Sequence, residues 1–125
     1  MSEQFGCTVM IVEDEPVNID ILVETLGEDY EIAVALSGEE ALEDIFNLKP
    51  DLILLDIRMP GMDGYEVCRR LKADEMTRAI PIVFVTALDD TADRRLGLDL
   101  GAVDYITKPF EPDDVRAKVG EYIAQ

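Results

Sequence analysis

The chain contains no histidine, no tryptophan and only two cysteines in 125 residues. The lack of histidine excludes an imidazole-based zinc site, a Ser-His-Asp triad and a phosphohistidine carried by this chain. Cys7 and Cys68 show no metal-ligand spacing. We expect both cysteines to be small core residues in a reducing compartment rather than partners in a disulfide.

Basic residues are also scarce, with 11 Lys and Arg against 28 Asp and Glu, so the net charge is −17. A field of this sign disfavours direct binding to nucleic acid or to an anionic membrane. No apolar run approaches the roughly 18 residues of a membrane span. Residues 1–4 lack the basic region of a signal peptide. We therefore expect a cytoplasmic protein whose acidic groups mostly form a solvated surface.

The chain does have the length of one domain and a hydrophobic content of 48%, which favours a compact fold. Short apolar runs alternate with segments of helical periodicity, and this alternation predicts an α/β protein with an open parallel sheet covered by helices on both faces. Strands are expected at residues 9–12, 31–35, 52–56, 82–86 and 105–107. Helices are expected at residues 16–26, after Ser37, after the loop 59–64, at residues 89–100 and after Pro112.

Local signals support these helices. Pro16 suits a first helical position, and Gly27 suits a helix end. Ser37 and Glu40 form a capping-box pattern, whereas Gly97 interrupts the expected helix 89–100. The inner faces are predicted to carry Ala41, Leu42, Ile45 and Phe46 in the second helix, Tyr65, Cys68 and Leu71 in the third, and Val115, Val119, Tyr122 and Ile123 in the last.

Polar side chains stand at the ends of four of the apolar runs. Glu13, Asp14 and Glu15 follow the first run, Asp56 ends the third, and Thr86 and Lys108 end the last two. Parallel strands present such ends along one rim of the sheet, where ligands bind. Clustered carboxylates repel one another, and a bound cation relieves that cost. Mg²⁺ needs few protein ligands, so the rim predicts a site for Mg²⁺ and a phosphoryl group.

Simpler interpretations exist for each position. The acids from 13 to 15 could stabilise the start of the helix at Pro16 through its dipole. Lys108 could be an ordinary surface lysine, and Thr86 could reflect only the β-propensity of threonine. These separate explanations do not account for Asp56, and they do not predict that all four positions fall at strand ends.

The motifs Val12-Glu13-Asp14-Glu15, Leu54 to Gly64, Val85-Thr86-Ala87 and Lys108-Pro109-Phe110 occur in one order over nearly the whole chain. In this order and spacing the sequence resembles the receiver domains of two-component response regulators, chemotaxis regulators among them. The resemblance implies that residues 1–125 form one receiver domain. It also implies a flavodoxin-like fold with the strand order 2-1-3-4-5.

The resemblance also implies roles for the rim residues. Asp56 resembles the phospho-accepting aspartate, and Lys108 resembles the lysine that pairs with the phosphoryl group and precedes a proline in a cis bond. Asp14 resembles a direct Mg²⁺ ligand, Glu13 one that acts through water, and the Arg58 backbone carbonyl a further ligand. Glu13 stands where the family more often has aspartate, and its extra methylene can alter the geometry of metal binding.

Two further residues resemble the family's switch. Thr86 resembles the hydroxyl that turns toward the phosphoryl group, and Tyr105 resembles the aromatic that turns inward with it. Together they are expected to reshape the face formed by the fourth helix, the fifth strand and the fifth helix. Arg58 and Leu88 correspond to positions along the path of the hydrolytic water, so the lifetime of the phosphoryl group is left open.

The resemblance implies partners as well. The phosphoryl donor is expected to be a sensor histidine kinase or a phosphotransfer protein, since this chain has no histidine of its own. The receiver is expected to control an effector protein or an output domain, and the sequence leaves open whether it acts alone or within a longer regulator. A symmetric homodimer through the same face is one possibility, with Arg94 of one copy meeting Asp114 of the other and Asp104 meeting Lys118. The alternative is a monomer in which these are ordinary solvated helix charges.

Two other classes share parts of this pattern. A flavin-binding electron carrier is also acidic and five-stranded, but its first loop must hold a phosphate, which Glu13 and its neighbours would repel. A haloacid-dehalogenase-like phosphatase also uses an aspartate at a strand end. That family places a second acid two residues later, where this chain has Arg58. We therefore expect a phospho-acceptor switch rather than a dedicated enzyme.

Overall fold

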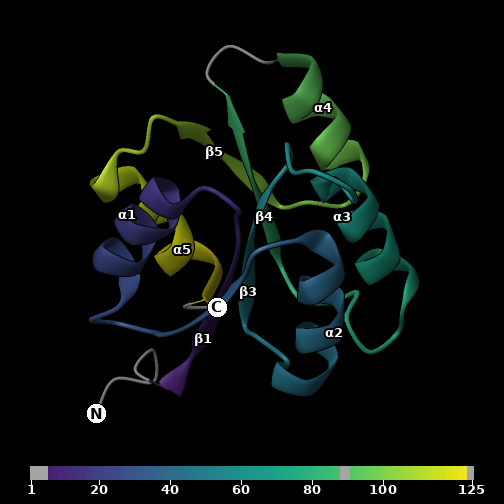
Figure 1. The fold of residues 1–125 in the computed structure, drawn as a ribbon, viewed down its shortest axis with the longest axis horizontal. Coiled ribbons are helices and arrows are strands. Elements are labelled where there is room, and N and C mark those ends of the chain that lie inside the picture. The colour runs from purple at the N-terminus through teal and green to yellow at the C-terminus, as the bar shows by residue number, and fades with distance from the viewer. Residues whose placement is uncertain (1–5, 88–90, 124–125) are drawn as a thin grey trace.

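The structure is a computed structural model, and it describes residues 6–87 and 91–123. Within these ranges, five strands form one parallel sheet in the order β2-β1-β3-β4-β5, and five helices cover it (Figure 1). This is the flavodoxin-like α/β fold predicted from the sequence. The elements in chain order are β1 (Thr8–Val12), α1 (Pro16–Leu26), β2 (Glu31–Ala35), α2 (Gly38–Leu48), β3 (Leu52–Asp56), α3 (Gly64–Ala73), β4 (Ile82–Ala87), α4 (Thr91–Asp99), β5 (Asp104–Lys108) and α5 (Pro112–Ile123).

Two layers of helices enclose the sheet, with α1 and α5 on one face and α2, α3 and α4 on the other (Figure 1). The central strands explain why their sequences are continuously apolar. In β3, Leu52 and Leu54 pack toward α1 and α5, while Ile53 and Leu55 pack toward α2 and α3. Because both faces are covered, every residue of β3 is buried, including the terminal Asp56.

The expected helix signals are present in the structure. Pro16 occupies the first turn of α1, and Gly27 is its C-cap. At α2 the hydroxyl oxygen of Ser37 accepts the Glu40 N–H at 3.1 Å, as a capping box requires. The Glu40 carboxylate, however, returns to the N–H of Leu36 at 3.3 Å rather than to that of Ser37.

The inner face of α2 is narrower than predicted. Ala41 and Ile45 are buried and Leu42 is partly buried, but the side chain of Phe46 is 40% exposed. Its placement on the inner face was wrong, because the buried stripe of this helix, which faces α3, β2 and β1, is limited to Gly38, Ala41 and Ile45. The helix predicted at residues 89–100 is α4, from Thr91 to Asp99, while Asp89 and Leu88 lie outside the described residues.

The remaining packing predictions agree with the structure. Neither cysteine forms a disulfide; Cys68 is buried on the inner face of α3, and Cys7 is partly buried against the opposite layer. Tyr65 is partly buried, with its ring edge-to-face against Phe84 at 5.6 Å between centroids. In α5, Val115 and Val119 are buried, with Tyr122 and Ile123 packed partly against them. Among the described residues, no helix has both the length and the apolar character needed to cross a membrane.

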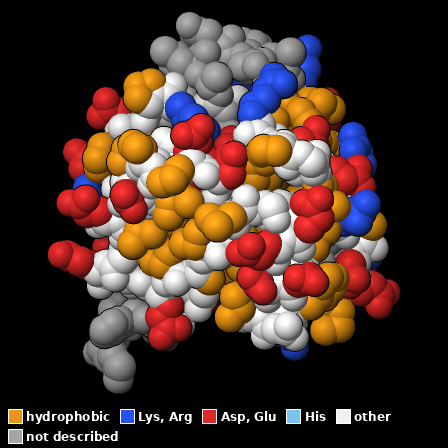
Figure 2. All heavy atoms as spheres, in the orientation of Figure 1, with side chains coloured by type: hydrophobic (Ala, Val, Ile, Leu, Met, Phe, Trp, Pro, Cys, Tyr) orange, Lys and Arg blue, Asp and Glu red, His pale blue; other side chains and the backbone are white. Residues whose placement is uncertain are grey.

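Figure 2 shows how the surface charge is distributed on one face of the molecule. Acidic side chains are spread over most of this face, whereas lysine and arginine gather at its top and right, where α3 and α4 lie (Figures 1 and 2). Helix α3 contributes Arg69, Arg70 and Lys72 to this more basic side. The charge on this face is therefore uneven, with more basic side chains on the side of α3 and α4.

Candidate functional site

The register of the sheet brings the predicted site residues to one rim. Val12, the last residue of β1, pairs with Leu55, so Glu13 leaves β1 beside Asp56. On the other side, Asp56 pairs with Val85, directly before Thr86. Lys108 pairs with the end of β4. The four strand ends therefore meet as the sequence predicted.

Three carboxylates converge at this rim. One side-chain oxygen from each of Glu13, Asp14 and Asp56 lies within 4.8 Å of the others. Glu13 and Asp56 are almost fully buried, at 1% and 2% exposure, and Asp14 is partly exposed. Two of these acids are thus withdrawn from the water that would otherwise stabilise their charges.

The amino group of Lys108 compensates part of this charge. Its Nζ lies 3.3 Å from Asp56 Oδ1 and 3.4 Å from Glu13 Oε1. The peptide bond to Pro109 is cis, as expected from the resemblance. Asp56 Oδ1 also accepts a long hydrogen bond, 3.4 Å, from the backbone N–H of Arg58. One cation and one amide donor therefore face the carboxylate predicted to accept phosphate.

Glu13 is the least satisfied member of the cluster. Its Oε2 accepts the Glu15 N–H at 3.1 Å, whereas the buried Oε1 has no hydrogen-bond partner in the described part of the chain despite its proximity to Lys108. Burial, followed by the charge of Asp56, raises the pKa of Glu13 above its ordinary value. The Glu15 N–H and Lys108 oppose this rise in pKa only in part.

A divalent cation suits this environment. Three acids offer oxygen ligands within reach of one point, and Mg²⁺ prefers oxygen ligands. A bound Mg²⁺ would also compensate the buried Glu13 carboxylate oxygen that has no hydrogen-bond partner among the described residues. The simpler interpretation of residues 13 to 15 as helix caps gains little support. Glu15 occupies the N-cap of α1 but makes no side-chain capping hydrogen bond, and Glu13 and Asp14 precede the helix.

The loop after β3 is held close to Asp56 by a glycine. The Gly64 N–H donates to the Ile57 carbonyl at 3.0 Å, and a Cβ on Gly64 would collide with the carbonyl oxygen of Asp56. The Asp63 side chain caps α3 by accepting the Glu66 N–H at 3.0 Å. Sequence reasoning treated this segment as a loop by composition and missed the role of Gly64. Its signal was a glycine directly after the capping aspartate.

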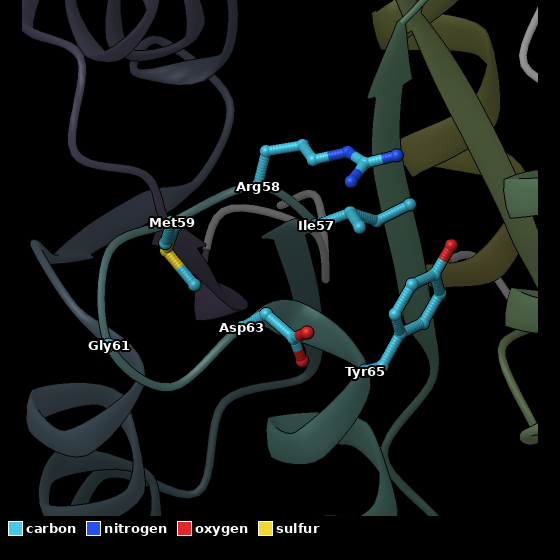
Figure 3. Close-up of a pocket in the computed structure, with 6 residues that line it drawn as sticks. All are labelled: Ile57, Arg58, Met59, Gly61, Asp63 and Tyr65. Carbon is cyan, nitrogen blue, oxygen red and sulfur yellow. The ribbon is translucent and has the colours of Figure 1, made fainter.

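Beside the rim, the same loop lines a cavity of about 410 Å³. Figure 3 shows the side chains of Arg58, Ile57 and Tyr65 extending to one side of the loop, toward β4. Asp63 and Met59 lie nearer the loop itself (Figure 3). The cavity is lined by Ile57, Arg58, Met59, Gly61, Asp63 and Tyr65. This feature has no simple sequence signal, because it depends on how the loop folds over the strand end.

The two predicted switch residues lie on neighbouring strands. Thr86 is buried, and its Oγ1 has no hydrogen-bond partner within residues 6–87 and 91–123. Tyr105 is half-buried and pairs with Phe84, two residues before Thr86 on β4. Since side chains alternate along a strand, Thr86 and Tyr105 project from the same face of the sheet. Both therefore lie on the side covered by α2, α3 and α4.

The charged residues predicted to pair across a dimer make contacts within the chain. Lys118 Nζ lies 3.7 Å from Asp104 and 3.9 Å from Asp114. The guanidinium of Arg94 lies 4.7 Å from the centre of the Tyr105 ring. The symmetric dimer stays a prediction, and forming it would require these internal pairs to exchange.

With this geometry established, comparison with known proteins decides the family. The model of the response regulator receiver domain matches residues 9–120. The chain belongs to the response regulator receiver domain family. It is therefore a receiver domain, a phospho-acceptor switch rather than a dedicated enzyme.

Individual relatives agree. The chain is 48% identical over 108 residues to the response regulator PleD of Caulobacter vibrioides, covering 86% of this chain and 23% of PleD. It is 45% identical over 112 residues to the DNA-binding response regulator MtrA of Mycolicibacterium smegmatis, covering 89% and 48%. The chain thus spans less than half the length of these curated relatives.

A solved structure extends the comparison to the rim. The receiver domain of a sensor histidine kinase from Pseudomonas aeruginosa has a magnesium ion coordinated in its active site cleft. The two chains superpose with a TM-score of 0.88 at 31% identity, covering 96% of this chain and 99% of that one. Together with the acidic cluster of Glu13, Asp14 and Asp56, this likeness supports a metal site in the present receiver.

Proposed function

We propose that residues 1–125 act as a phosphorylation-dependent signalling switch in which Asp56 accepts a phosphoryl group from a histidine-containing donor protein. The observation that carries this proposal is the buried Asp56 carboxylate held between two further acids and the amino group of Lys108. The Asp56 carboxylate can act as a nucleophile, and the Lys108 amino group at 3.3 Å can stabilise the incoming phosphoryl group. This arrangement favours phosphoryl transfer over a purely structural role for the ion pair.

The transfer is chemically balanced. A carboxylate oxygen of Asp56 attacks phosphorus in line, an O–P bond forms, and the P–N bond to the donor's imidazole breaks. The imidazole leaves with the bonding electron pair and takes up a proton from solvent. Lys108 stabilises the negative charge on the phosphoryl oxygens, because its Nζ already faces the accepting carboxylate. Water later hydrolyses the acyl phosphate and resets the switch.

Asp14, Asp56 and the Arg58 carbonyl are the proposed direct ligands of Mg²⁺, with Glu13 acting through a water molecule. Bound Mg²⁺ would neutralise phosphoryl charge that the three acids otherwise repel. The protein's own contribution is to hold these oxygens together at a cost in charge repulsion. Burial first, and the charge of Asp56 second, raise the pKa of Glu13, so repulsion is one part of the cost.

The output is proposed to pass through Thr86 and Tyr105. The unpartnered hydroxyl of Thr86 can donate to a phosphoryl oxygen at Asp56, since β3 and β4 are adjacent. Its movement leaves room for Tyr105 to turn inward on the same face. The surface of α4, β5 and α5 then changes, and an effector protein or output domain reads that change. The proposed donor is a sensor histidine kinase or a phosphotransfer protein.

The test is phosphorylation by a small donor. Wild-type protein incubated with acetyl phosphate and Mg²⁺ should gain the mass of one phosphoryl group in intact mass spectrometry. Asp56→Asn should gain none, whereas Asp20→Asn, which alters an exposed aspartate on α1, should behave as wild type. Phosphorylation of Asp56→Asn at the wild-type rate would show that another group is the acceptor.

A further inference from the structure

Tyr105 lies against two cations from different helices. The guanidinium carbon of Arg94, on α4, is 4.7 Å from the centre of the ring. The Nζ of Lys118, on α5, is 5.0 Å from the same centre. Both distances lie within the range of attractive cation–π contacts. The ring at the sheet edge is therefore bound to both helices that flank β5.

The two cations are held in different ways. Lys118 donates to the Tyr105 carbonyl at 2.7 Å and lies close to Asp104 and Asp114, so its position is fixed without the ring. Arg94 differs, because its Nε is buried and finds no hydrogen-bond partner among the residues that the structure describes. That donor gains a partner as soon as it reaches water. Arg94 can therefore leave the ring readily, whereas Lys118 cannot.

In the proposed switch, the Tyr105 ring changes position on activation. Tyr105 shares its sheet face with Thr86, whose hydroxyl is buried without a partner. The 4.7 Å contact with the guanidinium on α4 belongs to the present position of the ring, and turning the ring toward Thr86 would change it. The energy of the Arg94 contact is then lost on activation, so this contact favours the resting state.

We propose that Arg94 is a latch that holds Tyr105 at the sheet edge and so lowers the population of the active conformation before phosphorylation. The link from ring position to activation rests on the proposed function, but the contact itself does not. The latch acts through Tyr105, so Arg94 is a positioning residue. Lys118 contacts the ring as well, but its own position is fixed by its contacts with the Tyr105 carbonyl, Asp104 and Asp114.

The first test removes the latch and measures the proposed reaction. Arg94→Ala should raise the initial rate of phosphorylation by acetyl phosphate, and the affinity for beryllofluoride, by about 2- to 30-fold, the range of cation–π strengths expressed as an equilibrium. Arg95→Ala, an exposed neighbour on α4, is the matched control and should leave both unchanged. The latch hypothesis would be refuted if Arg94→Ala unfolded at the wild-type urea concentration but was phosphorylated at an unchanged or lower rate.

The second test does not depend on phosphorylation. The ring ¹H and ¹³C shifts of Tyr105 in untreated Arg94→Ala should move from the wild-type position along the line toward the beryllofluoride-bound wild type. In Arg95→Ala they should not move. If wild type accepts no phosphoryl group, the proposed function fails while these shifts still report on the latch. Ring shifts in Arg94→Ala that stay at the resting wild-type position would refute the latch alone.

Discussion

Replacing Gly97 with alanine distinguishes two accounts of α4. The sequence suggests that Gly97 is a weak point, since glycine in a helix interior costs about 1 kcal/mol relative to alanine. On that account Gly97→Ala should stabilise the protein. The structure indicates the opposite sign. A Cβ at residue 97 would lie 2.6 Å from Cδ2 and 3.0 Å from Cε2 of the Phe84 ring.

The magnitude depends on whether Phe84 can move. Its ring is only 2% exposed and packs edge-to-face with the Tyr65 ring, so a shift of Phe84 must also disturb its neighbours. Overpacking a closed core costs about 1–3 kcal/mol. After subtracting about 1 kcal/mol of improved helix propensity, we expect Gly97→Ala to lower the free energy of unfolding by about 1 kcal/mol.

Gly120 supplies the matched control. It lies within α5, and a Cβ there would meet nothing within 4 Å. Gly120→Ala should therefore raise the free energy of unfolding by about 1 kcal/mol. Urea unfolding of both variants measures a difference of about 2 kcal/mol between them. An equal stabilisation of both would refute the packing argument, and adding Phe84→Leu to Gly97→Ala should recover part of the loss if the clash is the cause.

Two further predictions concern the acidic rim. Because the pKa of Glu13 is raised in the folded protein, the folded state holds this proton more tightly than the unfolded chain does. Stability without Mg²⁺ should therefore fall as the pH rises from about 4.5, the ordinary value, through the folded pKa. Urea midpoints across this pH range should fall less steeply in Glu13→Gln, and an equally steep profile would contradict the assignment. In calorimetric titration with Mg²⁺, Asp14→Asn should weaken binding more than Glu13→Gln, since the loss of a direct ligand costs more than the loss of one acting through water. Equal losses would contradict this assignment of the two ligands.

Much of the fold could be predicted because the local signals and the tertiary structure agree. Helix α1 runs from Pro16 to Leu26 and β2 from Glu31 to Ala35, the bounds expected from the proline, the glycine and the apolar runs. The site was predictable for a related reason. A parallel sheet places consecutive strand ends on one rim, so Glu13, Asp56 and Lys108 meet whatever the details of the helices.

The features that were predicted wrongly or missed depend on tertiary contacts between residues far apart in the sequence or on different elements. Phe46 follows the helical period of α2 but is 40% exposed, because its neighbours do not extend far enough to cover it. Gly97 has the sequence signal of a weak helix, and only its closeness to Phe84 shows that the small residue is needed there. The contact between Arg94 and Tyr105 joins a helix to the following strand, and no periodicity describes that distance.

The rim and the edge strand of the sheet differ in how far their residues can move. At the rim, β3 is buried along its whole length, and Gly64 brings the following loop against the Asp56 carbonyl, so the backbone of the proposed acceptor has little room to move. At the edge strand β5, by contrast, Tyr105 is only half-buried, and two cations lie against its ring in addition to its packing on the core. A contact of that kind is worth about 0.5–2 kcal/mol, which one hydrogen bond from Thr86 to a phosphoryl oxygen, about 1.5–3 kcal/mol, can outweigh. A phosphoryl group bound to rigid residues can therefore change the edge of the sheet without disturbing its core.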